Sequence, residues 1–157
     1  MAREKKKQVT PSIMDRLSAD GPREDYGQNI SQLKESVRID LENLLNTRWR
    51  CSSWPPDLEQ LDLSLVNYGI PDFTGANFAA NADREQLRRI IERIVRGFEP
   101  RFKQVRVALV ENADDQDRTI RFRIDALLYA DPAPEQVVFD SQLEPATCNF
   151  SVGRSGA

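Results

Sequence analysis

The chain has 157 residues, which suits one domain, and its net charge is −3 with 39% hydrophobic and 30% charged residues. This acidic balance gives no reason to expect nucleic acid or an anionic lipid surface as a partner. The sequence has no apolar run near the roughly 20 residues that a membrane span needs. The basic start of the chain, residues 3–7, is not followed by the apolar stretch of a signal peptide. We therefore expect a cytoplasmic protein that binds no nucleic acid and has no membrane span.

The sequence contains no histidine, which excludes Ser-His-Asp and Cys-His catalysis and histidine-ligated zinc. Its two cysteines, Cys51 and Cys148, lie far apart and lack the spacing of a zinc cluster, so we expect free thiols. The usual phosphate-binding, metalloprotease and serine-hydrolase motifs are also missing. We expect no metal and no cofactor, and the composition favours a protein that binds other proteins over an enzyme.

Residues 1–29 are predicted to form an irregular N-terminal arm that is rich in charged and turn-forming residues. Within it, Ile13, Met14 and Leu17 fall on one side of a single helical turn. So short a helix is marginal in water, and we expect it to form only when docked, either on its own domain or on a partner. Ile13 and Leu17 are therefore candidate protein-binding residues.

The first long helix is predicted to start near Ser31, a good N-cap, and to end at about Arg48 or Trp49. Its apolar stripe consists of Leu33, Val37, Leu41, Leu44 and Leu45. An irregular connection follows it, with two prolines near its start and a turn-forming cluster at residues 67–73. This connection is too apolar for a linker, and we expect it to wrap the core.

The second helix is predicted to begin with a capping box formed by Asp83 and Gln86 and to end at Gly97, because Pro100 forbids its continuation. A core-facing stripe runs along it: Leu87, Ile90, Ile91, Ile94, Val95 and Phe98. Its outer face places opposite charges four residues apart: Glu85 and Arg89, Arg88 and Glu92, Glu92 and Arg96.

Alternating apolar and polar residues predict strands at 105–109 and 120–129, joined by a polar hairpin loop. A third strand begins near Val137, and residues 148–152 form its end or a fourth strand. The order of elements predicts an α+β fold: two main helices packed on an antiparallel β-meander of three to four strands. The single domain is expected to span residues 30–152, followed by a flexible tail at 153–157. If the C-terminal strand lies at the sheet edge, it offers unpaired N–H and C=O groups to another chain.

The triplet Glu99-Pro100-Arg101 lies between the second helix and the first strand. A glutamate and an arginine that flank a proline are not expected to satisfy each other on one strand face, so each would be available to a partner. The alternative is a solvated corner with a surface ion pair of little worth. A third reading pairs Glu99 with Asp125 as the two carboxylates of a glycosidase.

Arginine outnumbers lysine by 17 to 5, and many arginines lie between Arg84 and Arg123. Because arginine tolerates burial at interfaces better than lysine, this bias indicates an acidic protein partner. A solvated helix face with internal ion pairs explains much of the same pattern.

Several segments together resemble one family of proteins. They are residues 11–17 (PSIMDRL), 46–49 (NTRW), 64–73 (SLVNYGIPDF), 91–98, the Glu99-Pro100-Arg101 triplet, 122–128 (FRIDALL) and 137–140 (VVFD). They span almost the whole chain, in order. The chain resembles the TssE family of baseplate components in bacterial type VI secretion systems, which belongs to the baseplate wedge family of contractile phage tails, often labelled lysozyme-like.

The resemblance implies a non-enzymatic protein that joins the cytoplasmic baseplate wedge and seeds the contractile sheath by strand pairing. It implies as partners the wedge subunits TssF, TssG and TssK-like and the sheath subunits TssB and TssC-like. It also implies that Glu99, Pro100 and Arg101 make wedge contacts. For such an assembly protein we expect Glu99→Ala or Arg101→Ala to leave the fold intact but to weaken baseplate binding. The alternatives are a peptidoglycan-cleaving hydrolase, as the label suggests, and a small regulatory adaptor on a related fold.

Overall fold

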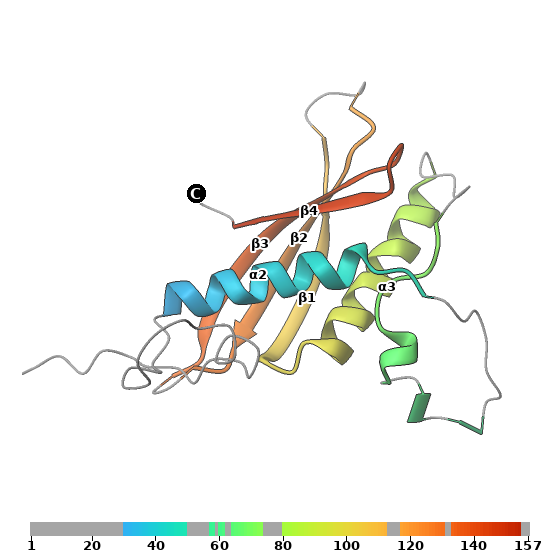
Figure 1. Cartoon of the computed structure of the whole chain (residues 1–157). Helices are drawn as coiled ribbons and strands as arrows, with labels where there is room; N and C mark the ends of the chain where they lie inside the picture. The colour runs from blue at the N-terminus through green and yellow to red at the C-terminus, as the bar shows by residue number, and fades with distance from the viewer. Residues whose placement is uncertain are drawn as a thin grey trace, which may run out of the picture.

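The computed structural model describes residues 30–49, 57–58, 60–61, 64–73, 80–112, 117–130 and 133–154. The N-terminal arm with Ile13 and Leu17, and also Cys51, lie outside these residues. The elements, in chain order, are α2 (Ile30–Asn46), η2 (Leu65–Asn67), α3 (Asn81–Phe98), β1 (Phe102–Val110), β2 (Ile120–Leu128), β3 (Glu135–Glu144) and β4 (Asn149–Arg154). The strands form an antiparallel sheet in the order β1-β2-β3-β4 (Figure 1). The predicted α+β fold is confirmed, and the chain segment at 148–152 belongs to a fourth strand.

Helix α2 buries the predicted leucine and valine stripe, because these side chains recur on one face at helical spacing. The helix ends at Asn46, before the predicted Arg48. The next residue, Thr47, accepts a hydrogen bond from the backbone N–H of Ile70 at 2.9 Å. Arg48 then forms an isolated parallel β-bridge with Ile70, so the chain has left the helix by that point.

Helix α3 buries four residues of the predicted stripe: Leu87, Ile91, Ile94 and Val95. The predicted capping box is wrong, because the N-cap residue is Ala80 and Asp83 lies inside the first turn. A carboxylate there still interacts favourably with the helix dipole. The helix continues through Gly97 to Phe98, and the N–H of Glu99 closes it by donating to the carbonyl oxygen of Val95 at 3.0 Å.

The sheet has one buried face and one open face. Buried side chains alternate with exposed ones along the strands. Both helices pack on the buried face, α3 against β1 and α2 against β4, so the molecule has two layers (Figure 1). β4 continues through Arg154, beyond the point where the flexible tail was expected to start.

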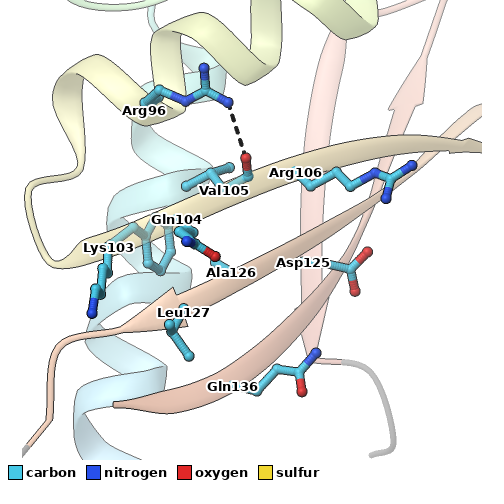
Figure 2. A pocket seen from close by; sticks show the side chains of 10 residues that line it. Arg96, Lys103, Gln104, Val105, Arg106, Asp125, Ala126, Leu127 and Gln136 are labelled. Atoms are coloured by element: carbon cyan, nitrogen blue, oxygen red, sulfur yellow. Dashed lines mark hydrogen bonds between the residues drawn. The ribbon is translucent and has the colours of Figure 1, made fainter.

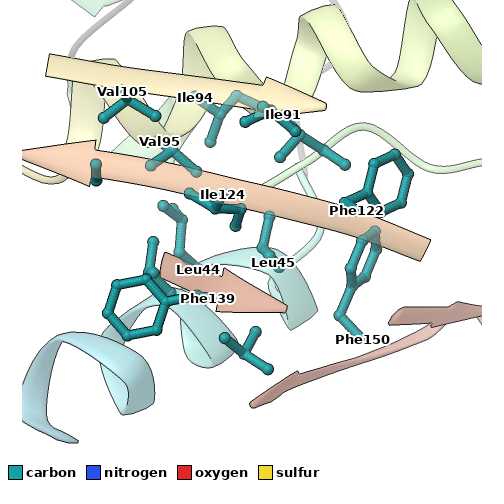
Figure 3. Packing of buried hydrophobic residues seen from close by; sticks show 14 of the residues in the cluster. Leu44, Leu45, Ile91, Ile94, Val95, Val105, Phe122, Ile124, Phe139 and Phe150 are labelled. Carbon is teal, nitrogen blue, oxygen red and sulfur yellow. The ribbon is translucent and has the colours of Figure 1, made fainter. Parts of the chain in front are cut away.

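The hydrophobic core fills the space between the helices and the sheet (Figure 3). At one end, the rings of Phe122 and Phe150 stack with their centroids 6.3 Å apart. At the other, Phe102 and Phe139 pack with their centroids 6.4 Å apart. A fully buried side chain of this size contributes about 1.5–3 kcal/mol relative to its exposed state, so these aromatic contacts stabilise the packing of the helices on the sheet.

The predicted wrapping of the core by the connection is confirmed for residues 68–73, whereas Leu65 and Val66 of η2 are exposed. Ile70 is fully buried, and Tyr68 and Phe73 pack against the core cluster. The Nε1 of Trp49 donates to the carbonyl oxygen of Gly69 at 2.6 Å, which ties this turn to the end of α2. Among the described helices, none combines the length and the apolar character that crossing a membrane requires.

Candidate protein-protein interface

Residues 99–102 form a tight turn between α3 and β1. The N–H of Phe102 donates to the carbonyl oxygen of Glu99 at 3.2 Å, and Pro100 occupies the second position, where its fixed φ favours such turns. The carbonyl oxygen of Arg101 accepts the N–H of Tyr129 at 2.9 Å, so the turn is also fastened to the end of β2. The triplet therefore has a fixed geometry on both sides.

Within this turn Arg101 binds the Glu99 carboxylate, with Nε 2.6 Å from Oε1 and Nη2 2.5 Å from Oε2. The prediction that these two side chains cannot satisfy each other is wrong, because residues 99–102 form a turn rather than an extended strand. The turn brings both side chains to the same side. The alternative of a solvated corner is wrong as well, since Glu99 is only 4% exposed.

The pair extends to α2 through a second carboxylate. Arg101 Nη2 also lies 2.5 Å from Oδ2 of Asp40, and its Nη1 lies 3.4 Å from the hydroxyl of Ser36. Burial alone would lower the pKa of Arg101, but hydrogen bonds and charges from Glu99 and Asp40 outweigh it and raise that pKa. Arg101 is therefore a fixed cation that joins α2 to the end of α3.

The solvent-accessible part of this corner is Asp40. Its side chain is 48% exposed, whereas the Arg101 side chain is 25% exposed and Glu99 is buried. Two carboxylates surround one guanidinium, so the cluster keeps one surplus negative charge, and its accessible part lies on α2. The position of the triplet and the family resemblance point to Glu99 and Arg101 but not to Asp40, which carries no signal of its own on the polar face of a helix.

The turn at residues 67–73 meets the same corner. The ring of Tyr68 packs edge-on against Phe98, with centroids 5.5 Å apart. Burial raises the pKa of Tyr68, and the negative charges of Asp40 and Glu99 raise it further. The two segments that carry most of the family resemblance are thus brought together. Leu65, on η2, is 88% exposed and adds an apolar side chain to this end of the molecule.

The β4 edge is not bare. Asn46 of α2 makes two hydrogen bonds with the backbone of Phe150, accepting its N–H at 2.9 Å and donating to its carbonyl oxygen at 2.9 Å. Arg38 donates to the carbonyl oxygen of Val152 at 3.1 Å. β4 is an edge strand, which the sequence analysis considered. The expectation that its edge groups are unpaired is wrong for three of them: the N–H and C=O of Phe150 and the C=O of Val152. Two polar side chains of α2 bind them.

The β1 edge is bound in the same manner by α3. Glu92 accepts the N–H of Val107 at 3.1 Å, and Arg88 donates to the carbonyl oxygen of Val107 at 3.0 Å. Arg96 donates to the carbonyl oxygen of Val105 at 3.2 Å. The three predicted ion pairs, Glu85–Arg89, Arg88–Glu92 and Glu92–Arg96, are confirmed. Part of the arginine excess therefore closes an edge of the sheet.

A shallow depression lies on the open face of the sheet beside β1 (Figure 2). Its rim carries Lys103, Arg106 and Gln136, and Arg106 stands opposite Asp125 in the strand register. Asp125 belongs to this open face, whereas Glu99 lies against α2 on the helix side, so the structure does not bring together the carboxylate pair of the glycosidase reading. The described residues contain no cluster of Cys, Asp and Glu that could hold a metal ion.

The comparisons with known proteins give one family. The model described as "Baseplate wedge protein gp25" matches residues 31–133, from the start of α2 to just before β3. No curated protein and no solved structure matches the chain. The matched residues include both helices, β1, β2 and the Glu99-Pro100-Arg101 corner, and they make up more than half of the sequence. The chain therefore belongs to the baseplate wedge protein gp25 family, a family of structural baseplate proteins.

Proposed function

We propose that the chain is a baseplate component of a type VI secretion system, a contractile machine built like a phage tail, in the bacterial cytoplasm. It joins the wedge subunits TssF, TssG and TssK-like and seeds the sheath of TssB and TssC-like subunits by strand pairing. The observation that carries the proposal is the family match over residues 31–133. The segments that resemble the TssE family support the type VI system as the particular machine.

The wedge contact is assigned to the corner of Glu99, Pro100 and Arg101 together with Asp40. Glu99 is buried and Arg101 is largely covered, so these two residues act by holding the corner in its conformation rather than by direct contact. Asp40 supplies the accessible charge. The N-terminal arm adds a second contact through Ile13 and Leu17. Sheath strands pair at the β4 edge, at the far side of the sheet from β1.

The test is reconstitution with named partners. The tagged full-length chain is co-expressed with the TssF-, TssG- and TssK-like subunits of its own gene cluster, and separately with the TssB- and TssC-like pair. We expect a stoichiometric complex by size-exclusion chromatography in each case. Failure of the wild-type chain to bind either set would overturn the proposal. Deletion of residues 1–29 is expected to weaken the wedge complex.

The corner is tested with Asp40→Ala, which is expected to weaken wedge binding at least tenfold with little change in melting temperature. Asp140→Ala is a matched control, because Asp140 is 49% exposed and also pairs with an arginine, Arg123 at 3.2 Å. Asp140 lies on the open sheet face, away from the corner. Equal binding by both variants would remove Asp40 from the interface.

The hydrolase alternative makes a different prediction. It requires cleavage of peptidoglycan by the purified chain and loss of that activity in Glu99→Gln. The buried, arginine-bound state of Glu99 favours a positioning role over proton transfer, because both of its oxygens already accept hydrogen bonds. Muropeptide release by the wild-type chain that Glu99→Gln abolishes would favour the alternative.

A further inference from the structure

The contact between Asn46 and Phe150 reproduces the bonding of a neighbouring strand. In an antiparallel ladder, one residue accepts the N–H of the residue opposite and donates its own N–H to that residue's C=O. The carboxamide of Asn46 does both to Phe150, at 2.9 Å in each direction. The side chain thus occupies the place of one residue of an added strand.

Arg38 occupies the next such place along β4. It donates to the carbonyl oxygen of Val152, which lies two residues beyond Phe150 and therefore points to the same outer side. The N–H of Val152 points outward with its C=O. Asn46 is exposed, so an incoming chain can reach the contact from solvent.

The opposite edge is closed more firmly. Arg88, Glu92 and Arg96 bind the outer groups of β1, and Glu92 also forms ion pairs with both arginines, at 2.9 and 3.0 Å. A strand that pairs with β1 must displace three charged side chains, one of them a carboxylate that accepts a backbone N–H. A strand that pairs with β4 must displace one neutral amide and one arginine, Arg38, which is itself paired with Glu35 at 2.7 Å and Glu42 at 2.5 Å.

We infer that Asn46 and Arg38 hold the β4 edge as exchangeable placeholders for an antiparallel strand of a partner, whereas the α3 side chains keep the β1 edge closed. This inference rests on the proposed function, in which the partner strand comes from a sheath subunit. It assigns the interaction surface to the outer side of residues 150–154. Strand addition then exchanges side-chain hydrogen bonds for backbone ones, so the edge is protected before assembly and still able to pair.

The first test needs no partner. Asn46→Ala removes both bonds to Phe150, and we expect amide hydrogen exchange at Phe150 to rise at least tenfold while the amide of Ile124 in β2 is unchanged. Asn43→Ala is the matched control, since Asn43 is an exposed asparagine one turn earlier on the same helix. Unchanged exchange at Phe150 in Asn46→Ala would overturn the placeholder role.

The second test measures binding of the purified TssB- and TssC-like pair by biolayer interferometry. Asn46→Ala is expected to bind about three- to tenfold more tightly than wild type, because one hydrogen-bonded group no longer has to be displaced. Equal or weaker binding by Asn46→Ala, with wild type still binding, overturns the inference alone. Absence of binding by wild type overturns the proposed function with it.

The edge itself is tested with Arg154→Pro. Arg154 stands opposite Phe139 and is two residues beyond Val152, so its N–H points outward and its loss leaves the pairing with β3 in place. We expect a loss of sheath binding of at least tenfold, with Arg154→Ala retaining it. Equal binding by the two variants would place the sheath contact elsewhere.

Discussion

Gly69 and Thr47 approach so closely that a Cβ on Gly69 would lie 2.4 Å from the carbonyl oxygen of Thr47. Gly69 also has a φ of 110°, which L side chains rarely adopt. The same carbonyl oxygen accepts the N–H of the buried Ile70. Two residues from distant parts of the sequence therefore fix the end of α2 against the turn that packs beside the Glu99-Pro100-Arg101 corner.

Gly69→Ala is accordingly expected to destabilise the fold by about 2–4 kcal/mol, because both the backbone conformation and the contact with Thr47 are unfavourable for a Cβ. Urea unfolding followed by circular dichroism measures the change. Gly153→Ala is the control, since a Cβ there meets its nearest neighbour at an ordinary 3.6 Å. Equal stability of the two variants would contradict a special role for Gly69.

The burial of Glu99 changes what substitution of its partner does. Removing one member of a buried ion pair leaves the other charge uncompensated, which costs about 3–5 kcal/mol when burial is complete. Arg101 is partly exposed, so we expect Arg101→Ala to destabilise by about 2–3 kcal/mol. This replaces the expectation from the sequence that such a variant leaves the fold intact.

Arg101→Lys tests the geometry of that contact. Lysine keeps the charge but lacks the planar fork that binds Glu99 and Asp40 together, so it is expected to recover less than half of the lost stability. Thermal unfolding at one buffer composition gives both values. A lysine variant as stable as wild type would show that charge alone matters at this position.

The periodic parts of the fold were predictable because their signal is local. The apolar stripe of α2 repeats at helical spacing, and apolar residues alternate with polar ones along β2. The side chains buried in the structure follow these same two periods. The long-range polar contacts were not predictable. Asn46 binds a residue 104 positions away, and nothing in its helical neighbourhood distinguishes it from Asn43.

The errors share a physical cause. Side-chain preference favours Asp83 as the N-cap of α3, whereas the helix is capped by Ala80, whose carbonyl oxygen accepts the backbone N–H of Arg84 at 3.3 Å. An extended strand would keep Glu99 and Arg101 apart, but Pro100 places them in a turn. In both cases tertiary context, rather than side-chain preference, decided the local conformation.

Ser141 offers a stabilising substitution. It is 3% exposed on β3, and its hydroxyl has no hydrogen-bond partner among the described residues. A buried hydroxyl without a partner costs about 1–3 kcal/mol. Ser141→Ala is therefore expected to raise stability by about 1 kcal/mol, visible as a higher melting temperature. The control is Gln142→Ala on the open face next to Ser141, which is expected to change stability by less than about 0.5 kcal/mol. A Ser141→Ala variant less stable than wild type would contradict the prediction and indicate a water bound to the hydroxyl.

Acid is expected to loosen the outer face of α3. Hydrogen bonds from Arg88 and Arg89 lower the pKa of Glu85 from 4.5 to about 2, with Arg88 the larger cause. Desolvation opposes this shift but does not outweigh it. Burial alone would raise the pKa of Glu92, but the Val107 N–H and the charges of Arg88 and Arg96 lower it. A carboxylate whose pKa is lower in the folded state stabilises the fold above its unfolded pKa.

This stabilisation is therefore fully present above about pH 4.5 and is lost as the pH falls towards about 2. Melting temperatures between pH 7 and pH 2 measure the loss, and Glu85→Gln is expected to flatten the curve below pH 4.5. Glu144→Gln is the control, because Glu144 accepts a hydrogen bond from Thr147 rather than from an arginine.

Glu92→Gln is expected to flatten the curve of melting temperature against pH as well. It is also expected to speed amide exchange at Val107, since a neutral amide oxygen is a weaker acceptor for that N–H than the carboxylate. If both variants followed the wild-type curve, the ion pairs of α3 would contribute nothing to acid stability, and closure of the β1 edge would rest on hydrogen bonds alone.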